Sequence, residues 1–190
     1  LKGMPLGTKF LASYFQSVTP RTAGYNTIDL TTLYLSSQLV IIFLMFVGAS
    51  PGSTGGGIKT STFAIIWLAI YSQLRGKKDT EVFERRIDNQ DVMQAFTVFM
   101  LFSLTLVIMT FLVSLSGEHD LVKVVFEVAS ALGTVGLTLG LTPDLTVMAK
   151  VWLIVTMFLG RVGPLTLGFA LAYKQKQPEI HYPKGKIMIG

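Results

Sequence analysis

Two stretches of this sequence match each other at a constant separation of 112 residues. Thr22-Ala23-Gly24-Tyr25 aligns with Thr134-Val135-Gly136-Leu137, and Phe46-Val47-Gly48 aligns with Phe158-Leu159-Gly160. Each copy contains a short amphipathic segment, a Thr-x-Gly-x turn and a long apolar segment that glycine interrupts near its end. The repeat therefore predicts two related folding units, and such repeats in membrane proteins often mark a transport path at the repeat interface.

The composition predicts that the chain lies in a membrane. Hydrophobic residues make up 51% of the chain, charged residues make up 14%, and the mean hydropathy is +0.57. The apolar residues concentrate in four nearly uncharged segments, 33–48, 61–74, 92–115 and 145–172. The last two are long enough to cross a hydrocarbon core of about 30 Å, which takes about 20 helical residues. The sequence has no cysteine, which excludes disulfides and thiolate metal sites.

The distribution of the net charge of +5 indicates how the chain is oriented. The basic residues cluster in 75–91 and in 173–190, next to apolar spans. This is the pattern of the positive-inside rule. Residues 75–91 are therefore predicted to be a cytoplasmic connection, and residues 173–190 a cytoplasmic tail. The same distribution disfavours nucleic acid as a partner and favours membrane lipid.

Residues 92–172 are predicted to form a complete repeat. Helix 92–115 leads outward and helix 145–172 returns. Between them, the short helix 121–132 and the turn 134–138 leave no room for a full span. A segment that starts and ends on one side of the membrane is a re-entrant loop.

Residues 1–74 are predicted to form a second repeat that lacks its leading helix. A short helix over 8–20 precedes the turn 22–26, and an apolar segment follows over 31–74. That segment would be roughly 66 Å long as one helix, about twice the bilayer, so it must break, and the glycine- and proline-rich stretch 48–60 supplies the break. We expect the chain to be the C-terminal part of a longer protein, with the remaining N-terminal part as a partner.

The Thr-x-Gly-x turns are the first candidate functional elements. Non-helical backbone at membrane depth leaves carbonyls unpaired, and a dehydrated cation satisfies such carbonyls. Glycine tolerates positive φ and so lets successive carbonyls point the same way. The C-terminal end of each short helix also favours a cation near the turn. The alternative for a single copy is an ordinary helix-terminating turn, but two copies in register argue for the cation site.

The glycine-rich stretch nearly matches a phosphate-binding loop. That motif is G-x-x-x-x-G-K-[ST], but here Ile58 precedes Lys59 and the stretch follows an apolar helix, which disfavours nucleotide binding. Irregular backbone at this depth is tolerated where it lines a water-filled cavity, so a flexible loop is predicted, with a static kink as the alternative. The candidate functional residues of this predicted loop are Gly52, Ser53, Thr54, Gly55, Gly56, Gly57 and Lys59.

Arg161 is the third candidate functional feature. It lies roughly 25 Å along the helix that begins near Leu145, within or near the inner half of the bilayer. An intramembrane arginine marks a functional site by default, and a positive charge facing a pore would slow cations. Arg161 can also pair with the glycine-rich loop. The alternative is an arginine that snorkels to the cytoplasmic surface.

The remaining polar residues offer no catalytic arrangement. His119 and His181 lie far apart in predicted extramembrane segments, and no nucleophile–base pair or metal-ligand cluster is recognisable. Glu127 lies in the short helix 121–132, where it can serve either as a hydrogen-bonding residue behind the filter or as part of an ion site. The sequence thus predicts a protein that is not an enzyme.

Three motifs give the chain a family resemblance, which covers essentially its whole length. Ser17–Asn26, Gly52–Thr60 and Gly160–Thr166 resemble the Trk/Ktr/HKT superfamily of potassium transporters, in particular the membrane subunit of bacterial Ktr systems. The resemblance implies an all-α integral membrane fold of helix–pore-loop–helix repeats of the potassium-channel-like type, with re-entrant pore helices and a broken transmembrane helix. It also implies four repeats around one pore, of which this chain resembles the third without its first helix and the complete fourth.

The resemblance further implies specific roles and partners. K+ is the transported ion, no cofactor is expected, and the glycine-rich stretch acts as a gate loop. The implied protein is a homodimer in the bacterial cytoplasmic membrane, with a cytosolic nucleotide-binding regulatory subunit on the basic segments. The filter carbonyls come from Thr22, Ala23, Gly24, Tyr25, Thr134, Val135, Gly136 and Leu137.

Two other functions compete with this interpretation. A secondary transporter with discontinuous helices accounts for the glycine-rich stretch, but not for two short helices that each end in Thr-x-Gly. A purely structural membrane subunit accounts for neither the irregular backbone nor Arg161. Asn26 and Thr138, which follow the two filter turns, depart from the regular Thr-Val-Gly-Tyr-Gly filter and leave strict K+ selectivity open.

Overall fold

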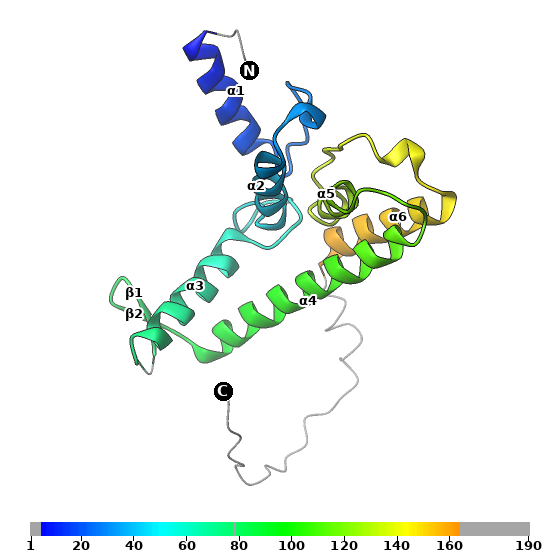
Figure 1. Ribbon diagram of the computed structural model, residues 1–190. Helices are drawn as coiled ribbons and strands as arrows, with labels where there is room; N and C mark the ends of the chain where they lie inside the picture. The colour runs from blue at the N-terminus through cyan, green and yellow to red at the C-terminus, as the bar shows by residue number, and fades with distance from the viewer. Residues whose placement is uncertain (1–4, 78, 164–190) are drawn as a thin grey trace, which may run out of the picture.

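The computed structural model describes residues 5–77 and 79–163, and its elements follow one another in two similar series. Six α-helices, two 3-10 turns and one β-hairpin make up this part of the chain (Figure 1). Their bounds are α1 Leu6–Val18, η1 Leu30–Thr32, α2 Leu35–Phe46, α3 Thr60–Leu74, β1 Thr80–Val82, β2 Arg85–Ile87, α4 Asn89–Ser114, α5 Leu121–Leu132, η2 Thr142–Asp144 and α6 Val147–Val162.

The 112-residue repeat of the sequence recurs in the positions of these elements. The turn η1 and the turn η2 are offset by 112 residues, as are the first residues of α2 and α6. The short helix α1 precedes η1 as α5 precedes η2. The two repeats therefore share the order helix, loop, 3-10 turn, helix.

Side-chain caps fix where several helices begin. The carboxylates of Asp88 and Asp120 accept hydrogen bonds from the first turns of α4 and α5, and the hydroxyl of Thr146 accepts one from Ala149 N–H at the start of α6. Each cap satisfies a backbone donor that has no partner within its helix. The helix α6 ends before Gly163, whose φ of 85° is left-handed.

The apolar stretch predicted as a broken helix over 31–74 contains two separate helices, α2 and α3. The segment between them is closed by a bridge in which Gly48 N–H donates to Ile58 O at 2.9 Å and Ile58 N–H donates to Phe46 O at 3.0 Å. The predicted start at residue 31 is wrong, because Asp29 accepts from Thr31 N–H and caps η1, and α2 begins only at Leu35.

The connection 75–91 contains structure that the sequence analysis does not predict. Strands β1 and β2 pair in antiparallel fashion around Phe83 and Glu84, which both have positive φ. Lys77 pairs with Glu81 at 2.9 Å, and this hydrogen bond lowers the pKa of the exposed Glu81 carboxyl. The hairpin adds a small β element, with three residues in each strand, to an otherwise helical part of the chain.

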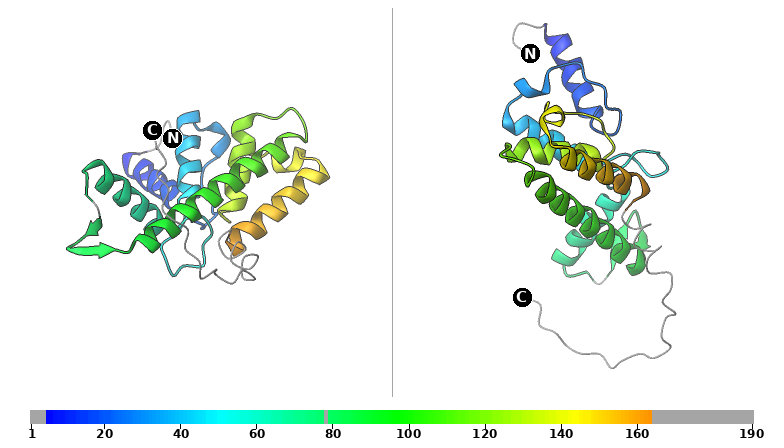
Figure 2. Two further views of the ribbon diagram at one scale, coloured as in Figure 1. Left: turned by 90° about the horizontal axis from the view of Figure 1, so that it is seen from below. Right: turned by 90° about the vertical axis from the view of Figure 1, so that its right-hand side faces the viewer.

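The helix α5 is the centre of the described fold. It packs against α2, α4 and α6, and α4 also contacts α3 (Figure 1). Figure 2 shows α4 running across the molecule, with the α1–α3 segment on one side and α5 and α6 on the other. One apolar cluster joins α4, α5 and α6 through Val113, Val128 and Leu153, and another joins α2 to α5 through Met45 and Phe126.

The outer faces of the helices remain strongly apolar. Among the described residues, α4 is the one helix that is both long and apolar enough to cross a membrane, with a mean hydropathy of 2.5 over its best window. Large exposed apolar side chains include Phe10, Trp67, Phe111 and Phe158. The predicted helix 145–172 begins later, at Val147, and is helical to Val162, while residues 164–172 and the tail 173–190 lie outside the described residues.

Candidate functional site

The two Thr-x-Gly-x turns share an unusual backbone conformation. Thr22 and Gly24 have φ of 74° and 73°, and Thr134 and Gly136 have φ of 53° and 91°, whereas the residue between each pair lacks positive φ. Left-handed φ is uncommon for a β-branched residue such as threonine. When left- and right-handed conformations alternate, successive peptides turn the same polar group toward one side. Each turn therefore aligns its carbonyls instead of alternating them as a β-strand does.

Short helices hold these turns through the N–H groups and leave most carbonyls free. Ala23 N–H and Gly24 N–H both donate to Thr19 O at the end of α1, at 3.1 and 3.2 Å. In the other repeat, Val135 N–H donates to the carbonyl of Ser130 at 2.9 Å, and Gly136 N–H donates to its hydroxyl at 3.2 Å.

Seven of the eight carbonyls in the two turns are free. Within the described part of the chain, none of the carbonyls of the following residues accepts a hydrogen bond: Thr22, Ala23, Gly24, Thr134, Val135, Gly136 and Leu137. At the last residue of the turns the two repeats differ, because Tyr25 O accepts from Thr19 Oγ1 at 2.6 Å. Unpaired carbonyls at membrane depth are costly, so their concentration here points to a polar occupant.

The two turns approach each other closely. A Cβ placed on Gly24 would overlap the carbonyl oxygen of Val135 and lie 3.9 Å from the Cα of Gly136. By contrast, a Cβ on Gly136 would meet nothing within 4 Å. Glycine at position 24 is therefore required both by its positive φ and by the neighbouring backbone, and Gly136 faces open space.

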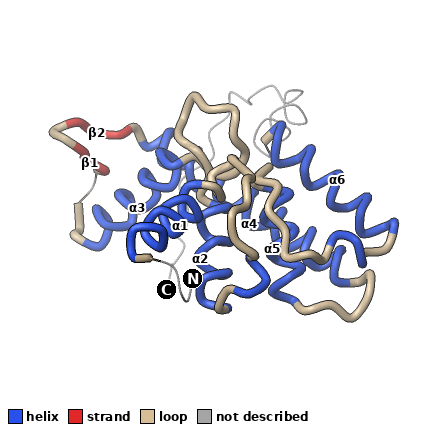
Figure 3. The backbone as a smooth tube through the Cα atoms, turned by 90° about the horizontal axis from the view of Figure 1, so that it is seen from above, coloured by secondary structure: helices blue, strands red, loops and turns tan. Residues whose placement is uncertain are grey.

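The loop between α2 and α3 lies against both turns. Gly56 N–H donates to Thr134 Oγ1 at 3.0 Å, and the side chain of Thr22 lies next to Gly55, where an added Cβ would come within 2.5 Å of its hydroxyl. Figure 3 shows loop segments running between the α1–α2 pair and the α5–α6 pair. The predicted gate loop and both predicted filter turns thus meet at one place.

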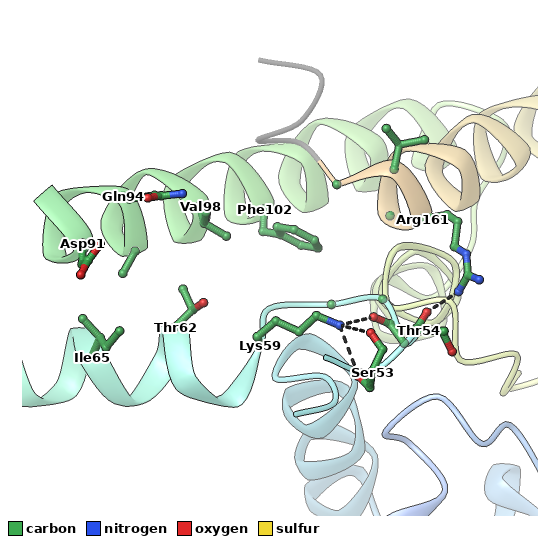
Figure 4. A pocket seen from close by; sticks show the side chains of 17 residues that line it. Ser53, Thr54, Lys59, Thr62, Ile65, Asp91, Gln94, Val98, Phe102 and Arg161 are labelled. Carbon is green, nitrogen blue, oxygen red and sulfur yellow. Dashed lines mark hydrogen bonds between the residues drawn. The ribbon is translucent and has the colours of Figure 1, made fainter. Parts of the chain in front are cut away.

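Two basic side chains hold this loop by its carbonyls (Figure 4). Lys59 Nζ donates to Ser53 O at 3.1 Å and to Gly55 O at 2.6 Å, and it also contacts Ser53 Oγ at 3.4 Å. Arg161 Nη1 donates to the intervening carbonyl, Thr54 O. Three successive carbonyls therefore accept hydrogen bonds from cations, which are stronger than those between neutral groups.

A cavity of about 630 Å³ adjoins the loop, and no residue of either turn lines it. It is bounded by the loop, by α3 and α4, and by the end of α6 (Figure 4). Its polar lining includes Lys59 and Arg161 together with Thr62, Asp91 and Gln94. The loop therefore contacts both turns and also lines this cavity.

The structure adds supporting residues that sequence reasoning missed. Thr19 and Ser130, at the ends of α1 and α5, hold the two turns in place, although neither stands out in the sequence. No sequence signal distinguishes them from other polar residues near helix ends, because their burial, at 1% and 4% exposed, is a property of the folded structure. Gln16, also buried, donates to Thr27 Oγ1 at 3.2 Å.

A comparison with known protein families decides what kind of protein this is. A family model described as the cation transport protein TrkH matches residues 1–181. The chain belongs to this family. The resemblance expected from the sequence motifs is therefore confirmed, as is the expectation of a multi-pass protein of the cell membrane.

Individual members of the TrkH family match most of this chain. It is 42% identical over 182 residues to the Ktr system potassium uptake protein B of Bacillus subtilis, covering 96% of this chain and 41% of that protein. It is 41% identical over 184 residues to the protein of the same name from Vibrio alginolyticus, covering 97% of this chain and 40% of the relative. The chain thus spans about two fifths of the length of these relatives.

A solved structure confirms the helical fold of the family for this chain. The crystal structure of the potassium transporter TrkH from Vibrio parahaemolyticus matches with a TM-score of 0.74 and 26% sequence identity. The match covers 87% of this chain and 37% of the TrkH chain.

Proposed function

We propose that this chain forms part of a pathway that carries K+ across the cytoplasmic membrane of a bacterium. One observation carries the proposal: two turns from different repeats, each with aligned and unpaired carbonyls, lie side by side against one loop. Carbonyl oxygens that replace the hydration shell are the means by which K+ filters bind their ion. The names of the relatives, potassium uptake proteins, agree with this choice of ion.

In this proposal the two turns are two strands of a selectivity filter. Carbonyls of Thr22–Tyr25 and Thr134–Leu137 contribute ligands, and further repeats of the complete protein supply the others. The hydrogen bond that Tyr25 O accepts from Thr19 makes it a weaker ligand than its counterpart, Leu137 O. The proposed filter is therefore least regular at Tyr25, the last filter residue of the third repeat, where one carbonyl already accepts a hydrogen bond.

The loop 48–60 is the gate in this proposal. Its contacts with both filter turns and its place in the lining of the cavity of about 630 Å³ support a position between filter and cavity, where it would control the passage of a cation. Lys59 and Arg161 lock the closed position, and their charges repel a passing cation. Opening breaks the hydrogen bonds to Thr54 O and from Gly56 N–H, and the small residues of the loop offer little steric resistance.

The proposed partners follow from faces that the described chain leaves uncovered. In the fourth repeat, α4 covers α5 and α6, whereas a groove between α1 and α2 of about 350 Å³ has no such cover among the described residues. We assign that place to a helix from the remaining N-terminal part of the protein.

The hairpin β1–β2 carries Arg85 and Arg86 and an almost fully exposed Phe83. We assign it to contact with a cytosolic, nucleotide-binding regulatory subunit. The complete protein is proposed to be a homodimer.

Ion uptake in cells tests the proposed function. The full-length protein is expressed in a bacterium that lacks its own K+ uptake systems, and growth is followed at limiting K+ together with ⁸⁶Rb+ uptake. We expect uptake, and we expect faster basal uptake after Gly55 and Gly56 are deleted. Lys123→Gln, which removes an exposed charge outside the loop and outside the basic segments, serves as the control. If the membrane-inserted protein supports no K+ or Rb+ uptake, the proposal fails; if the deletion leaves uptake unchanged, the loop is only a kink.

A further inference from the structure

Glu127 is a buried carboxylate that the proposed pathway does not use as an ion ligand. It lies in the second half of α5, and it is only 5% exposed. Within the described residues it forms no ion pair. A carboxylate at membrane depth is costly unless polar groups satisfy it, so its partners reveal its role.

Three donors converge on this carboxylate, and all come from the segment that follows the fourth-repeat filter turn. The hydroxyl of Thr138 donates to Oε1, Leu141 N–H donates to Oε1 at 3.3 Å, and the hydroxyl of Thr142 donates to Oε2 at 3.0 Å. The Thr138 hydroxyl in turn accepts from Gly140 N–H at 2.8 Å. Every partner donates, which suits a carboxylate, because an ionised carboxylate can only accept.

These contacts tie the outer end of the filter strand to its own short helix. Thr138 directly follows Leu137, the last residue of the predicted filter. One turn further along α5, Ser130 accepts from Gly136 N–H at 3.2 Å. The helix α5 therefore supports the filter strand at two points. Ser130 holds the central glycine, Gly136, and Glu127 holds Thr138 at the outer end.

The third repeat has a weaker brace at the equivalent height. Gln16 on α1 donates to Thr27 Oγ1 at 3.2 Å and to Asn26 Oδ1 at 3.5 Å, and Asn26 is the counterpart of Thr138. The side-chain oxygen of Gln16 is buried without a partner in the described structure. Gln16 and Glu127 thus occupy non-equivalent positions on their helices but hold equivalent points of the two filter strands. Only in the fourth repeat is the supporting group a carboxylate, and both of its oxygens accept hydrogen bonds.

We infer that Glu127 is a positioning residue that fixes the spacing of the filter carbonyls and thereby contributes to the preference for K+ over Na+. This inference rests on the proposed function. Geometry at the filter depends on how firmly the strand is held, because flexible carbonyls adapt to ions of different radius. Loss of the brace frees Thr138 and the outer end of the strand, whereas the gate loop, which contacts the other end, keeps its contacts.

The test compares three variants of the full-length protein in proteoliposomes. Glu127→Met removes every acceptor at similar length, Glu127→Gln keeps one acceptor oxygen, and Glu118→Gln removes a carboxylate from an exposed position outside the network. The readout is the ratio of K+ to Na+ permeability, measured per reconstituted protein. We expect the ratio to fall about tenfold in Glu127→Met, to fall less in Glu127→Gln and to stay unchanged in Glu118→Gln.

A ratio, unlike a rate, does not fall merely because less protein folds. If Glu127→Met cannot be purified, the ratio of Glu127→Gln decides. A wild-type ratio in the folded Glu127 variants overturns the inference and reduces Glu127 to a stabilising residue. An equal fall in Glu118→Gln also overturns it, since the effect would then be a general loss of outer charge. A wild-type protein that conducts no K+ contradicts the proposed function itself, which separates the two failures.

Discussion

The two filter glycines are equivalent in sequence but not in their surroundings, and this difference makes a sharp prediction. Replacing Gly24 with alanine forces a left-handed alanine, which costs about 1–2 kcal/mol. The new methyl group also overlaps the carbonyl oxygen of Val135, and overpacking of this kind costs about 1–3 kcal/mol more. The sum is about 2–5 kcal/mol for Gly24→Ala. Gly136→Ala carries only the backbone cost, because its Cβ meets nothing within 4 Å.

The assay measures thermal unfolding of the purified full-length protein and its K+ to Na+ permeability ratio. Gly24→Ala should lower both the midpoint temperature and the ratio by more than Gly136→Ala, because it moves a carbonyl of the opposite repeat. Gly76→Ala is the matched control, since Gly76 also has left-handed φ, at 68°, has open space around it and lies far from both turns in the sequence. It should reduce stability about as much as Gly136→Ala and leave the ratio unchanged. If Gly24→Ala leaves the ratio intact, or if Gly76→Ala alters it equally, the two turns do not form one filter.

Three further substitutions test the loop and its supports. Arg161→Gln removes the charged donor to Thr54 O, worth about 1.5 kcal/mol at this exposed position, so basal ⁸⁶Rb+ uptake should rise about tenfold. Thr134→Val leaves the buried Gly56 N–H without its partner, which costs about 1–3 kcal/mol and should raise basal uptake and lower the unfolding midpoint. Gly160→Ala places a methyl group against a backbone carbonyl of α5 and should lower the unfolding midpoint by several degrees, with an unchanged permeability ratio.

Each of these three substitutions has an outcome that would contradict its reasoning. Unchanged uptake by well-folded Arg161→Gln, with Lys123→Gln as the control, would remove Arg161 from the gate. Wild-type stability in Thr134→Val would mean that water replaces the hydroxyl at Gly56. An unfolding midpoint that Gly160→Ala does not lower would mean that α5 and α6 can separate to admit a methyl group.

Local sequence signals predicted those elements that local chemistry determines. The short helix α5 covers the predicted range 121–132, because Asp120 caps its start and Gly133 ends its apolar pattern. The break between α2 and α3 lies where Pro51 and its neighbouring glycines disfavour a helix. The start of α2 was misplaced because the Asp29 cap, which favours a short turn, competes with an uninterrupted apolar pattern.

The contacts that create the site were beyond local reasoning. The sequence predicts that Arg161 can pair with the loop 48–60, but it does not indicate that Thr54 O is the partner. The pairing of Gly56 with Thr134 joins residues 78 positions apart. The repeat made the two turns comparable, but it could not bring Gly24 against Val135, because that approach depends on how α2 packs against α5. The asymmetry between Gln16 and Glu127 arises in the same way, from partners that the repeat does not specify.

The most direct test of the central claim is to locate the ion. The full-length protein, prepared in Rb+ or Tl+ in place of K+, is crystallised and its anomalous density is measured. The account predicts peaks between the carbonyls of Thr22–Gly24 and those of Thr134–Gly136, on the side of the loop 48–60 away from the cavity of about 630 Å³. A transporting protein whose only bound ions lie elsewhere, with these carbonyls facing lipid or packed protein, would contradict it.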